Sequence, residues 1–169
     1  MDLKKFAIIA LGSNLGEPGK SILEAMARLQ AYSDEPVVRS SLWQTSPVDC
    51  PPNSPVFVNA VAGLVPRTNE TPETLLEKLK LLEKEFGRAP KQIPNEPRPL
   101  DLDLIAFRNE TRHSPNLIVP HPRAHLRKFV LQPLNEIAPG LVLAGQGMTV
   151  SQLLAGLSSG ESVIRLDKI

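Results

Sequence analysis

The sequence predicts an α+β fold: a ferredoxin-like βαββαβ core with an antiparallel sheet, helices packed on it, and extra C-terminal helices. Two observations lead to this prediction. Strand-like apolar runs and helix-like periodic segments occur in the order strand, helix, strand, strand, helix, strand. Two further helix-like segments follow near the end of the sequence. The length of 169 residues fits a single domain over residues 1–169.

The first strand and helix follow from an apolar run and a proline. Residues Phe6–Leu11 are continuously apolar and end at Gly12, which fits a buried central strand. Pro18 opens a helix, because its missing N–H has no partner in a first turn anyway. The helix has an apolar stripe made of Ile22, Leu23, Met26 and Leu29.

Two strands then follow with no helix between them. We expect these strands over Val37–Trp43 and Val56–Val65. The link between them is rich in proline, at Pro47, Pro51, Pro52 and Pro55. Loops of this length without regular structure are often binding loops.

The second helix and the fourth strand complete the core. Thr71 is the expected cap of the helix, Pro72 lies in its first turn, and the helix ends at Gly87. The fourth strand covers Leu100–Phe107, after a second proline-rich link. We expect both proline-rich links at the same end of the sheet. The C-terminal elements are helices over Phe129–Ile137 and Val150–Leu157 and a possible strand over Val163–Leu166.

Composition and charge exclude several classes of protein. The formal net charge is +1, which gives no strong field for nucleic acid or a membrane surface. No apolar run approaches the roughly 20 residues of a spanning helix, and the N-terminus has no signal-peptide pattern. The single cysteine, Cys50, excludes an internal disulfide framework. We expect a cytoplasmic monomer that binds neither nucleic acid nor membrane.

The fourth strand carries the most informative pattern. Leucines and aspartates alternate from Leu100 to Leu104, so Asp101 and Asp103 share one face. Their backbones lie roughly 6.5–7 Å apart, so the two carboxylates repel, and a pair of divalent cations about 3.5–4 Å apart would fit between them. The alternative is an edge strand whose acidic face is simply solvated.

Basic residues surround this strand in the sequence. Arg88 and Arg98 flank the second proline-rich link, and more basic side chains occur in the segment 120–129. Arginine suits phosphate oxygens, so these residues favour a polyphosphate site; alternatively they are surface charges. His121 is a candidate phosphate contact. Zinc is disfavoured there, because no Cys/His set has the spacing of a zinc site.

A phosphate-cradling P-loop is disfavoured. Gly19-Lys20-Ser21 opens the first helix, but Asn14 stands where that motif needs a glycine. Pro18 also removes an amide that the cradle would use.

Six short segments, each weak alone, carry a family resemblance through their order and spacing. They are Leu-Gly-Ser-Asn-Leu-Gly (Leu11–Gly16), Phe-Val-Asn-Ala-Val (Phe57–Val61), Gly87-Arg88, Pro97–Leu104, Val-Pro-His-Pro-Arg (Val119–Arg123), and Arg127 with Phe129–Leu131. With them the chain resembles the 6-hydroxymethyl-7,8-dihydropterin pyrophosphokinases of folate synthesis, over nearly its whole length. Members of this family transfer diphosphate from ATP to the hydroxymethyl group of the pterin and release AMP.

The resemblance implies a metal and nucleotide site. Asp101 and Asp103 would bind two magnesium ions that bridge the ATP phosphates and the pterin hydroxyl. The positions matched to ATP binding are Glu83, Arg88, Arg98, His121 and Arg127. Arg88 and Arg98 would neutralise phosphate charge as a loop closes, and with the two aspartates they form the implied catalytic set.

The resemblance also implies a pterin site. Asn59 would hydrogen-bond the pterin edge, and Phe57 and Phe129 would hold its flat ring. Thr45 and backbone groups around Val48 would complete the pocket.

The chain departs from the family pattern in the second proline-rich link. Asn95 replaces a frequent tryptophan, Pro90 replaces a second arginine, and Lys80 stands where glutamine is common. A non-catalytic pterin or nucleotide sensor is therefore a second hypothesis. An RNA-binding module is a third, because RNA readers share the topology, although only 4% of residues are aromatic.

Overall fold

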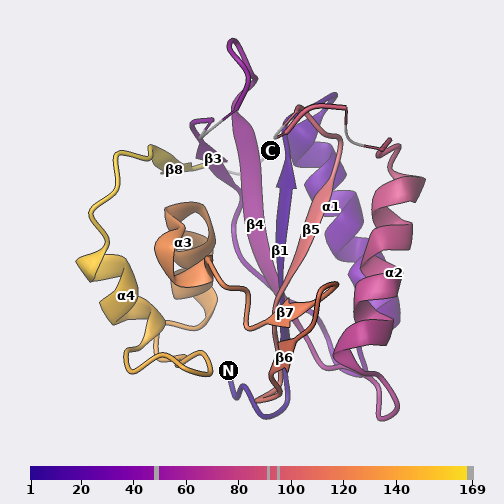
Figure 1. The fold of residues 1–169 in the computed structure, drawn as a ribbon, viewed down its shortest axis with the longest axis vertical. Helices are drawn as coiled ribbons and strands as arrows, with labels where there is room; N and C mark the ends of the chain where they lie inside the picture. Colours follow the sequence, from indigo (N-terminus) through magenta and orange to yellow (C-terminus); the bar gives the residue numbers. More distant parts are fainter. Residues whose placement is uncertain (48–49, 91, 95, 167–169) are drawn as a thin grey trace.

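The computed structural model describes residues 1–47, 50–90, 92–94 and 96–166 (Figure 1). Its strands and helices follow the predicted order. In chain order they are β1 (Ala7–Ser13), α1 (Pro18–Leu29), η1 (Gln30–Tyr32), β2 (Val38–Arg39), β3 (Trp43–Thr45), β4 (Phe57–Leu64), α2 (Pro72–Glu85), β5 (Asp101–Phe107), β6 (Arg112–His113), β7 (Ile118–Val119), η2 (Ala124–Leu126), α3 (Lys128–Ile137), α4 (Val150–Gly156) and β8 (Val163–Arg165).

The main sheet has the predicted topology. Its strands lie in the order β5-β1-β4-β3-β8, with β2 also paired to β4, and the neighbours are antiparallel. The α+β prediction with a ferredoxin-like antiparallel sheet is confirmed. The C-terminal strand β8 extends this sheet beyond β3.

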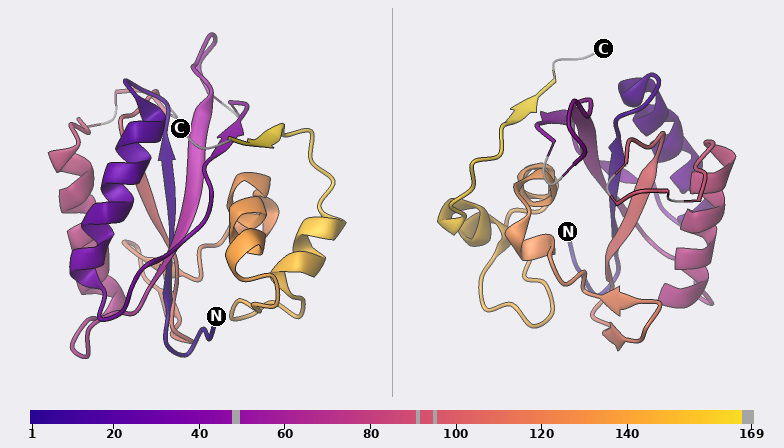
Figure 2. Two further views of the ribbon diagram at one scale, coloured as in Figure 1. Left: turned by 180° about the vertical axis from the view of Figure 1, so that it is seen from behind. Right: turned by 45° about the horizontal axis from the view of Figure 1, so that its top comes forward.

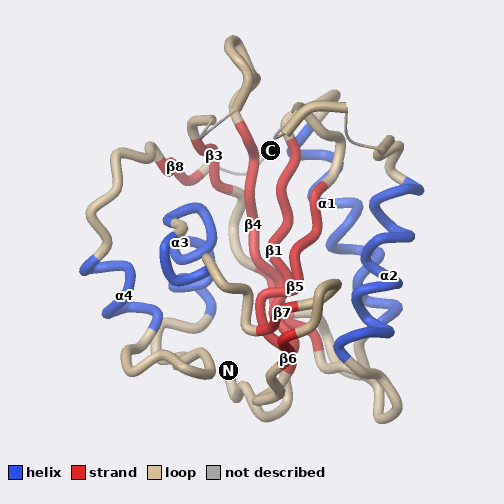
Figure 3. Tube along the Cα trace, in the orientation of Figure 1, coloured by secondary structure: helices blue, strands red, loops and turns tan. Residues whose placement is uncertain are grey.

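Helices cover both faces of the sheet (Figures 1 and 2). Figure 3 shows the strands between the α1/α2 pair and the α3/α4 pair. Alternate residues of each strand therefore enter two different cores. Ile9, Leu11, Leu102 and Leu104 pack with α1 and α2, whereas Ile8, Val61 and Ile105 pack with α3 and α4.

The second helix is capped as predicted. Thr71 Oγ1 accepts a hydrogen bond from Thr74 N at 3.1 Å, and Thr74 Oγ1 accepts one from Thr71 N at 2.9 Å. This pair satisfies two backbone donors of the first turn. The helix ends before Gly87, whose φ of 91° favours glycine.

The predicted second strand, Val37–Trp43, is wrong as one element. The structure divides it into β2 and β3, because the five residues from Arg39 to Trp43 lie opposite the four from Ala62 to Asn59. The extra residue interrupts the ladder. At this break the Ser40 side chain replaces a backbone acceptor of the sheet, since its Oγ accepts a hydrogen bond from Val61 N at 2.9 Å.

The first strand is longer than predicted. Gly12 and Ser13, which lie beyond the apolar run Phe6–Leu11 that predicted the strand, belong to β1, where Gly12 lies opposite both Asn59 and Asp101. The Ser13 hydroxyl donates to Pro99 O at 2.7 Å, which ties this strand end to the second proline-rich link. Both proline-rich links therefore lead into strands at this end of the sheet, as expected.

We find no helix in the described part of the chain that is both long and apolar enough to span a membrane.

Candidate functional site

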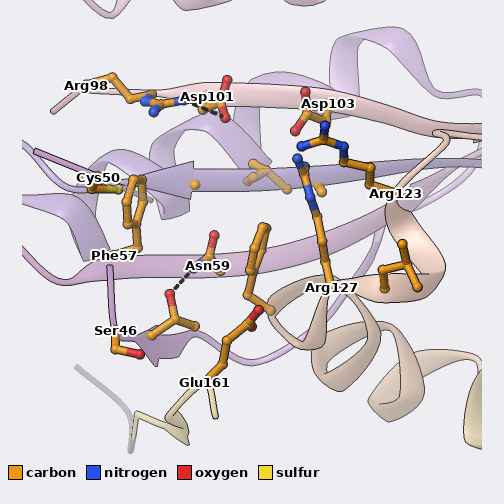
Figure 4. Close-up of a pocket in the computed structure, with 16 residues that line it drawn as sticks. Ser46, Cys50, Phe57, Asn59, Arg98, Asp101, Asp103, Arg123, Arg127 and Glu161 are labelled. Carbon is orange, nitrogen blue, oxygen red and sulfur yellow. Dashed lines mark hydrogen bonds and ion pairs between the residues drawn. The ribbon is translucent and has the colours of Figure 1, made fainter. Parts of the chain in front are cut away.

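A cavity of about 450 Å³ opens on the α3 side of the sheet, where β1 ends and β4 and β5 begin (Figure 4). Its walls come from four strands, the start of α3 and the segment before β8. The lining residues are Ala10, Leu11, Gly12, Thr45, Ser46, Cys50, Phe57, Asn59, Arg98, Asp101, Asp103, Arg123, Leu126, Arg127, Phe129 and Glu161.

Strand alternation explains which side chains reach the cavity. Asp101 and Asp103 share a face of β5 with Ile105, which packs under α3 and α4. The two aspartates lie beyond this cover and line the cavity. Gly12, opposite Asp101 on β1, keeps the floor of the cavity open, because a Cβ there would come within 3.0 Å of Asn59 Oδ1.

Asp101 is held by two arginines. Arg88 Nη1 lies 2.6 Å from Asp101 Oδ1, and Arg98 Nη1 lies 3.3 Å from Oδ2. Both carboxylate oxygens of Asp101 are therefore engaged with guanidinium groups. Salt bridges of this kind in a partly buried site fix orientation as well as charge.

Glu83 supports the same cluster from α2. Its Oε2 accepts hydrogen bonds from Arg88 Nη1 and from Leu102 N, each at 2.8 Å. Burial raises the pKa of Glu83, and its contact with Leu102 N opposes that rise. Glu83 thus joins the α2 helix to β5 and positions Arg88 against Asp101.

Asp103 has a different environment from Asp101. Burial, and then the charge of Asp101, raise the pKa of Asp103 to about 7. Arg123 and Arg127 extend toward it in Figure 4. Within the described residues, neither arginine forms an ion pair with a carboxylate. The cavity therefore contains guanidinium groups available to an anion.

The other end of the cavity is aromatic and polar. The Asn59 Nδ2 group donates to Thr45 Oγ1 at 2.7 Å, and no donor to Asn59 Oδ1 is found among the described residues, so this oxygen can accept from a ligand. Phe57 and Phe129 line the same space. The Arg98 Cζ atom lies 5.6 Å from the centre of the Phe57 ring, and the Arg127 Cζ atom lies 5.5 Å from the centre of the Phe129 ring. This end suits a flat heterocycle.

His121 lies in an adjoining pocket of about 260 Å³ rather than in the main cavity. A bulge at Ile105 turns its carbonyl to accept from His121 N at 2.8 Å. Burial, followed by Arg127 and Arg123, lowers the pKa of His121 to about 4, so the imidazole is neutral at pH 7. Asp103 borders both spaces, and the rest of the pocket is mainly apolar: Leu76, Leu102, Leu104, Pro115, Asn116, Leu117, Ile118 and Pro122.

The structure brings most of the predicted site residues together. Those that line the cavity are Thr45, Phe57, Asn59, Arg98, Asp101, Asp103, Arg127 and Phe129. Glu83 and Arg88 lie behind Asp101 and contact the site through it. His121 lies one pocket away. Val48 and Asn95 lie outside the described residues.

Eight cavity residues were not among the predicted site residues: Ala10, Leu11, Gly12, Ser46, Cys50, Arg123, Leu126 and Glu161. Arg123 belongs to the basic segment 120–129, so its charge was a usable signal. Glu161 had none. Its place depends on the pairing of β8 with β3, which the local sequence does not reveal.

The two aspartates fit a magnesium site that the ligand completes. The described residues contain no group of three or more His, Cys, Asp and Glu side chains that could hold a metal ion alone. Magnesium in phosphoryl-transfer sites typically has one or two carboxylate ligands, with phosphate oxygens and water as the others. A carboxylate pair beside unpaired arginines meets that requirement.

Comparison with known proteins gives a consistent result. Residues 8–139 match the family model described as 7,8-dihydro-6-hydroxymethylpterin-pyrophosphokinase (HPPK). The chain is 39% identical over 148 residues to the 2-amino-4-hydroxy-6-hydroxymethyldihydropteridine pyrophosphokinase of Pseudomonas aeruginosa, covering 87% of this chain and 88% of that protein. For the enzyme of the same name from Haemophilus influenzae, the identity is 39% over 137 residues, covering 81% and 84%.

Longer relatives contain a similar region. The folic acid synthesis protein fol1 of Pneumocystis carinii is 38% identical over 143 residues, which are 85% of this chain and 19% of that protein. The solved HPPK-DHPS of Plasmodium falciparum with pteroate has a TM-score of 0.70 at 16% identity, covering 89% of this chain and 42% of that one. At that identity the likeness concerns the fold. The chain thus spans only part of these longer proteins.

Proposed function

The chain belongs to the 7,8-dihydro-6-hydroxymethylpterin-pyrophosphokinase family, and on that premise we propose the reaction it catalyses. It transfers diphosphate from ATP to the hydroxymethyl group of 6-hydroxymethyl-7,8-dihydropterin and releases AMP. The main support is the position of Asp103, which borders both the aromatic cavity and the adjoining apolar pocket, with Asp101 beside it in the cavity. A site for two substrates needs such a pair of spaces, with charge neutralisation where they meet.

ATP occupies the adjoining pocket and the arginine side of the cavity. The apolar walls, which include Leu104 and Ile118, suit a purine ring. From there the triphosphate passes Asp103 and reaches the guanidinium groups of Arg123 and Arg127. Neutral His121 contributes a hydrogen-bond donor, because its Nδ1 accepts from Arg123 N at 3.1 Å and its proton is therefore on Nε2.

Asp101 and Asp103 would hold two magnesium ions. Divalent cations at this position would supply charge neutralisation to the transferred phosphates. Each carboxylate oxygen of Asp101 has a second lone pair besides the one directed at a guanidinium, so Asp101 can ligate a cation while Arg88 and Arg98 stay beside it. The two guanidinium groups add positive charge at the same place, in keeping with the neutralising role expected for these arginines.

The pterin ring lies between Phe57 and Phe129. Asn59 Oδ1 and the Thr45 segment contact its polar edge, so that the hydroxymethyl group points toward the aspartates. The hydroxyl oxygen attacks the β-phosphorus of ATP, and AMP leaves. Positioning and charge neutralisation suffice for such a transfer, so no covalent protein group is required.

A transfer assay tests the proposal. The full chain is mixed with ATP, magnesium and 6-hydroxymethyl-7,8-dihydropterin, and AMP is measured by chromatography. We expect AMP only when both the pterin and magnesium are present. Saturable pterin binding without AMP would instead favour the sensor hypothesis. AMP formed at the same rate without the pterin would contradict the proposed acceptor.

We also propose that one copy of the chain is sufficient for activity, because all the assigned side chains come from a single chain. Sedimentation of the active protein tests this. An active species found only as a dimer would contradict it.

A further inference from the structure

The wall of the cavity farthest from β5 carries a carboxylate with no assigned role. Figure 4 shows Glu161 entering the cavity from the β8 side, opposite Arg98 and Asp101. It lies two residues before Val163, which pairs with Thr45 on β3. Because side chains alternate along extended backbone, Glu161 and Val163 lie on the same side as Thr45.

The backbone around Glu161 is fixed by hydrogen bonds. Ser46 N donates to Ser162 O at 3.2 Å, and Ser162 N donates to Ser46 Oγ at 3.3 Å. Glu161 N itself donates to Ser159 Oγ at 3.1 Å. These contacts join the segment before β8 to the end of β3, so the carboxylate is presented by an anchored backbone.

The carboxylate of Glu161 has an unused acceptor. Its Oε2 is buried and has no hydrogen-bond partner among the described residues. A buried acceptor without a donor is unfavourable, so a donor is expected from a ligand. Trp43 Nε1 is also buried and unpartnered, but Trp43 lies opposite Arg165, four residues farther along the chain than Glu161.

The neighbouring groups indicate which ligand atoms would fill this gap. Asn59 Oδ1 is a second acceptor in the same cavity, because its amide nitrogen is already engaged with Thr45. A ligand edge that carries N–H donors matches two acceptors. The aminopyrimidinone edge of a pterin has such donors, namely its 2-amino group and the adjacent ring N–H.

We propose that Glu161 is a specificity-determining residue that accepts hydrogen bonds from the 2-amino group and ring N–H of the pterin. The inference rests on the proposed function and assigns one further contact to its acceptor site. It also predicts discrimination. A lumazine is a pteridine with a 2-oxo group in place of the 2-amino group. Its 2-oxo oxygen would lie against the Glu161 carboxylate, so two hydrogen-bond acceptors would face each other with no donor between them.

A comparison of two ligands and two proteins tests this contact. The full chain and Glu161→Gln are titrated with 6-hydroxymethylpterin and with 6-hydroxymethyllumazine. The wild type should bind the pterin more tightly than the lumazine. In Glu161→Gln, pterin affinity should fall roughly 10- to 100-fold, as for a lost hydrogen bond to a charged group. Lumazine affinity should hold or rise, because the amide can donate to the 2-oxo group.

The controls separate a ligand contact from a structural one. Glu77→Gln, on the exposed surface of α2, removes the same charge and should leave both affinities unchanged. ATP binding and the melting temperature should be the same in Glu161→Gln as in the wild type. Equal losses for both ligands, or a lowered melting temperature with an unchanged ligand preference, would overturn the inference and make the carboxylate structural.

This outcome is distinct from failure of the proposed function. Wild-type protein that binds neither pteridine and forms no AMP would refute the function and, with it, the contact. Wild-type protein that binds the pterin and forms AMP, with an unchanged pterin-to-lumazine ratio in Glu161→Gln, would refute the contact alone.

Discussion

The two faces of the central sheet are built by the same strands and serve different purposes. On the α1/α2 face, Leu11, Leu102 and Leu104 are buried along the full length of the strands. On the opposite face, α3 and α4 cover only part of the sheet. Where their cover ends, the same strands present Gly12, Asn59 and the aspartates.

The difference shows how a small domain obtains stability and chemistry together. Asp101 and Leu102 are adjacent in the sequence, yet Asp101 lines the cavity and Leu102 is packed in a core. Strand alternation makes this possible, because adjacent residues point to opposite faces. We therefore expect substitutions at the cavity to affect activity, and substitutions in the α1/α2 core away from both substrate spaces to affect folding.

The largest effect should come from Asp103→Asn. The change removes one of the two proposed magnesium ligands and should lower the transfer rate on the order of 10³-fold or more, as for the loss of a central electrostatic group. The fold should persist, because burial beside Asp101 disfavours the charged form. The rate of AMP formation and the circular dichroism spectrum measure the two effects. A variant that fails to fold would show that the pair is structural.

The matched change on the other face is Ile9→Ala on β1. Ile9 is buried among α1 and α2 residues and lines neither of the two proposed substrate spaces, so the truncation should lower the free energy of unfolding by about 2–5 kcal/mol. Activity per folded molecule should change little below the melting transition. Urea unfolding and AMP assays on the same preparation test this. A loss of activity as large as that of Asp103→Asn would mean that the two faces are not independent.

Asp103 should also make the stability of the free protein depend on pH. Its pKa in the folded protein, about 7, is above the unfolded value near 4, so the folded state binds this proton more tightly. The resulting stability is present below about pH 4 and is lost as the pH rises through about 7.

The experiment compares wild type with Asp103→Asn by urea unfolding at pH 5 and pH 7.5. The variant lacks this proton, so its stability relative to wild type should increase between the two pH values, on the order of 2 kcal/mol after allowance for solvent screening. His121 is present in both proteins, so its own titration largely cancels from the difference. A difference that does not change with pH would contradict the raised pKa.

Much of the fold and the placement of the aspartate pair could be predicted because their signals are local, whereas the pterin-site residues were implied by the family resemblance. The alternation of Leu102 and Asp103 places them on opposite faces whatever the rest of the chain does. The cap at Thr71 likewise depends on four consecutive residues.

The rest depends on long-range pairing. The second strand is divided because it has one extra residue opposite β4. His121 lies in the adjoining pocket because its backbone N–H bonds to the carbonyl of Ile105 at the bulge in β5. Glu161 reaches the cavity only because β8 pairs with β3. Periodicity within a segment does not determine its register against another strand, so these placements required the structure.

The smallest effect should come from Arg123→Gln, which tests whether the nucleotide site on the α3 side of the sheet extends as far as Arg123. Arg123 lines the cavity without an ion pair among the described residues, and we propose that it contacts the triphosphate. One lost contact from a solvent-exposed guanidinium should weaken ATP binding by roughly 5- to 10-fold. Pterin binding should be unchanged, because the phosphate and pterin ends of the cavity are separate.

Arg39→Gln on β2, exposed and distant from the cavity, is the matched control. Equal ATP affinity for the wild type and both variants would place the edge of the nucleotide site at Arg127, since Arg123 would then be a solvated surface charge.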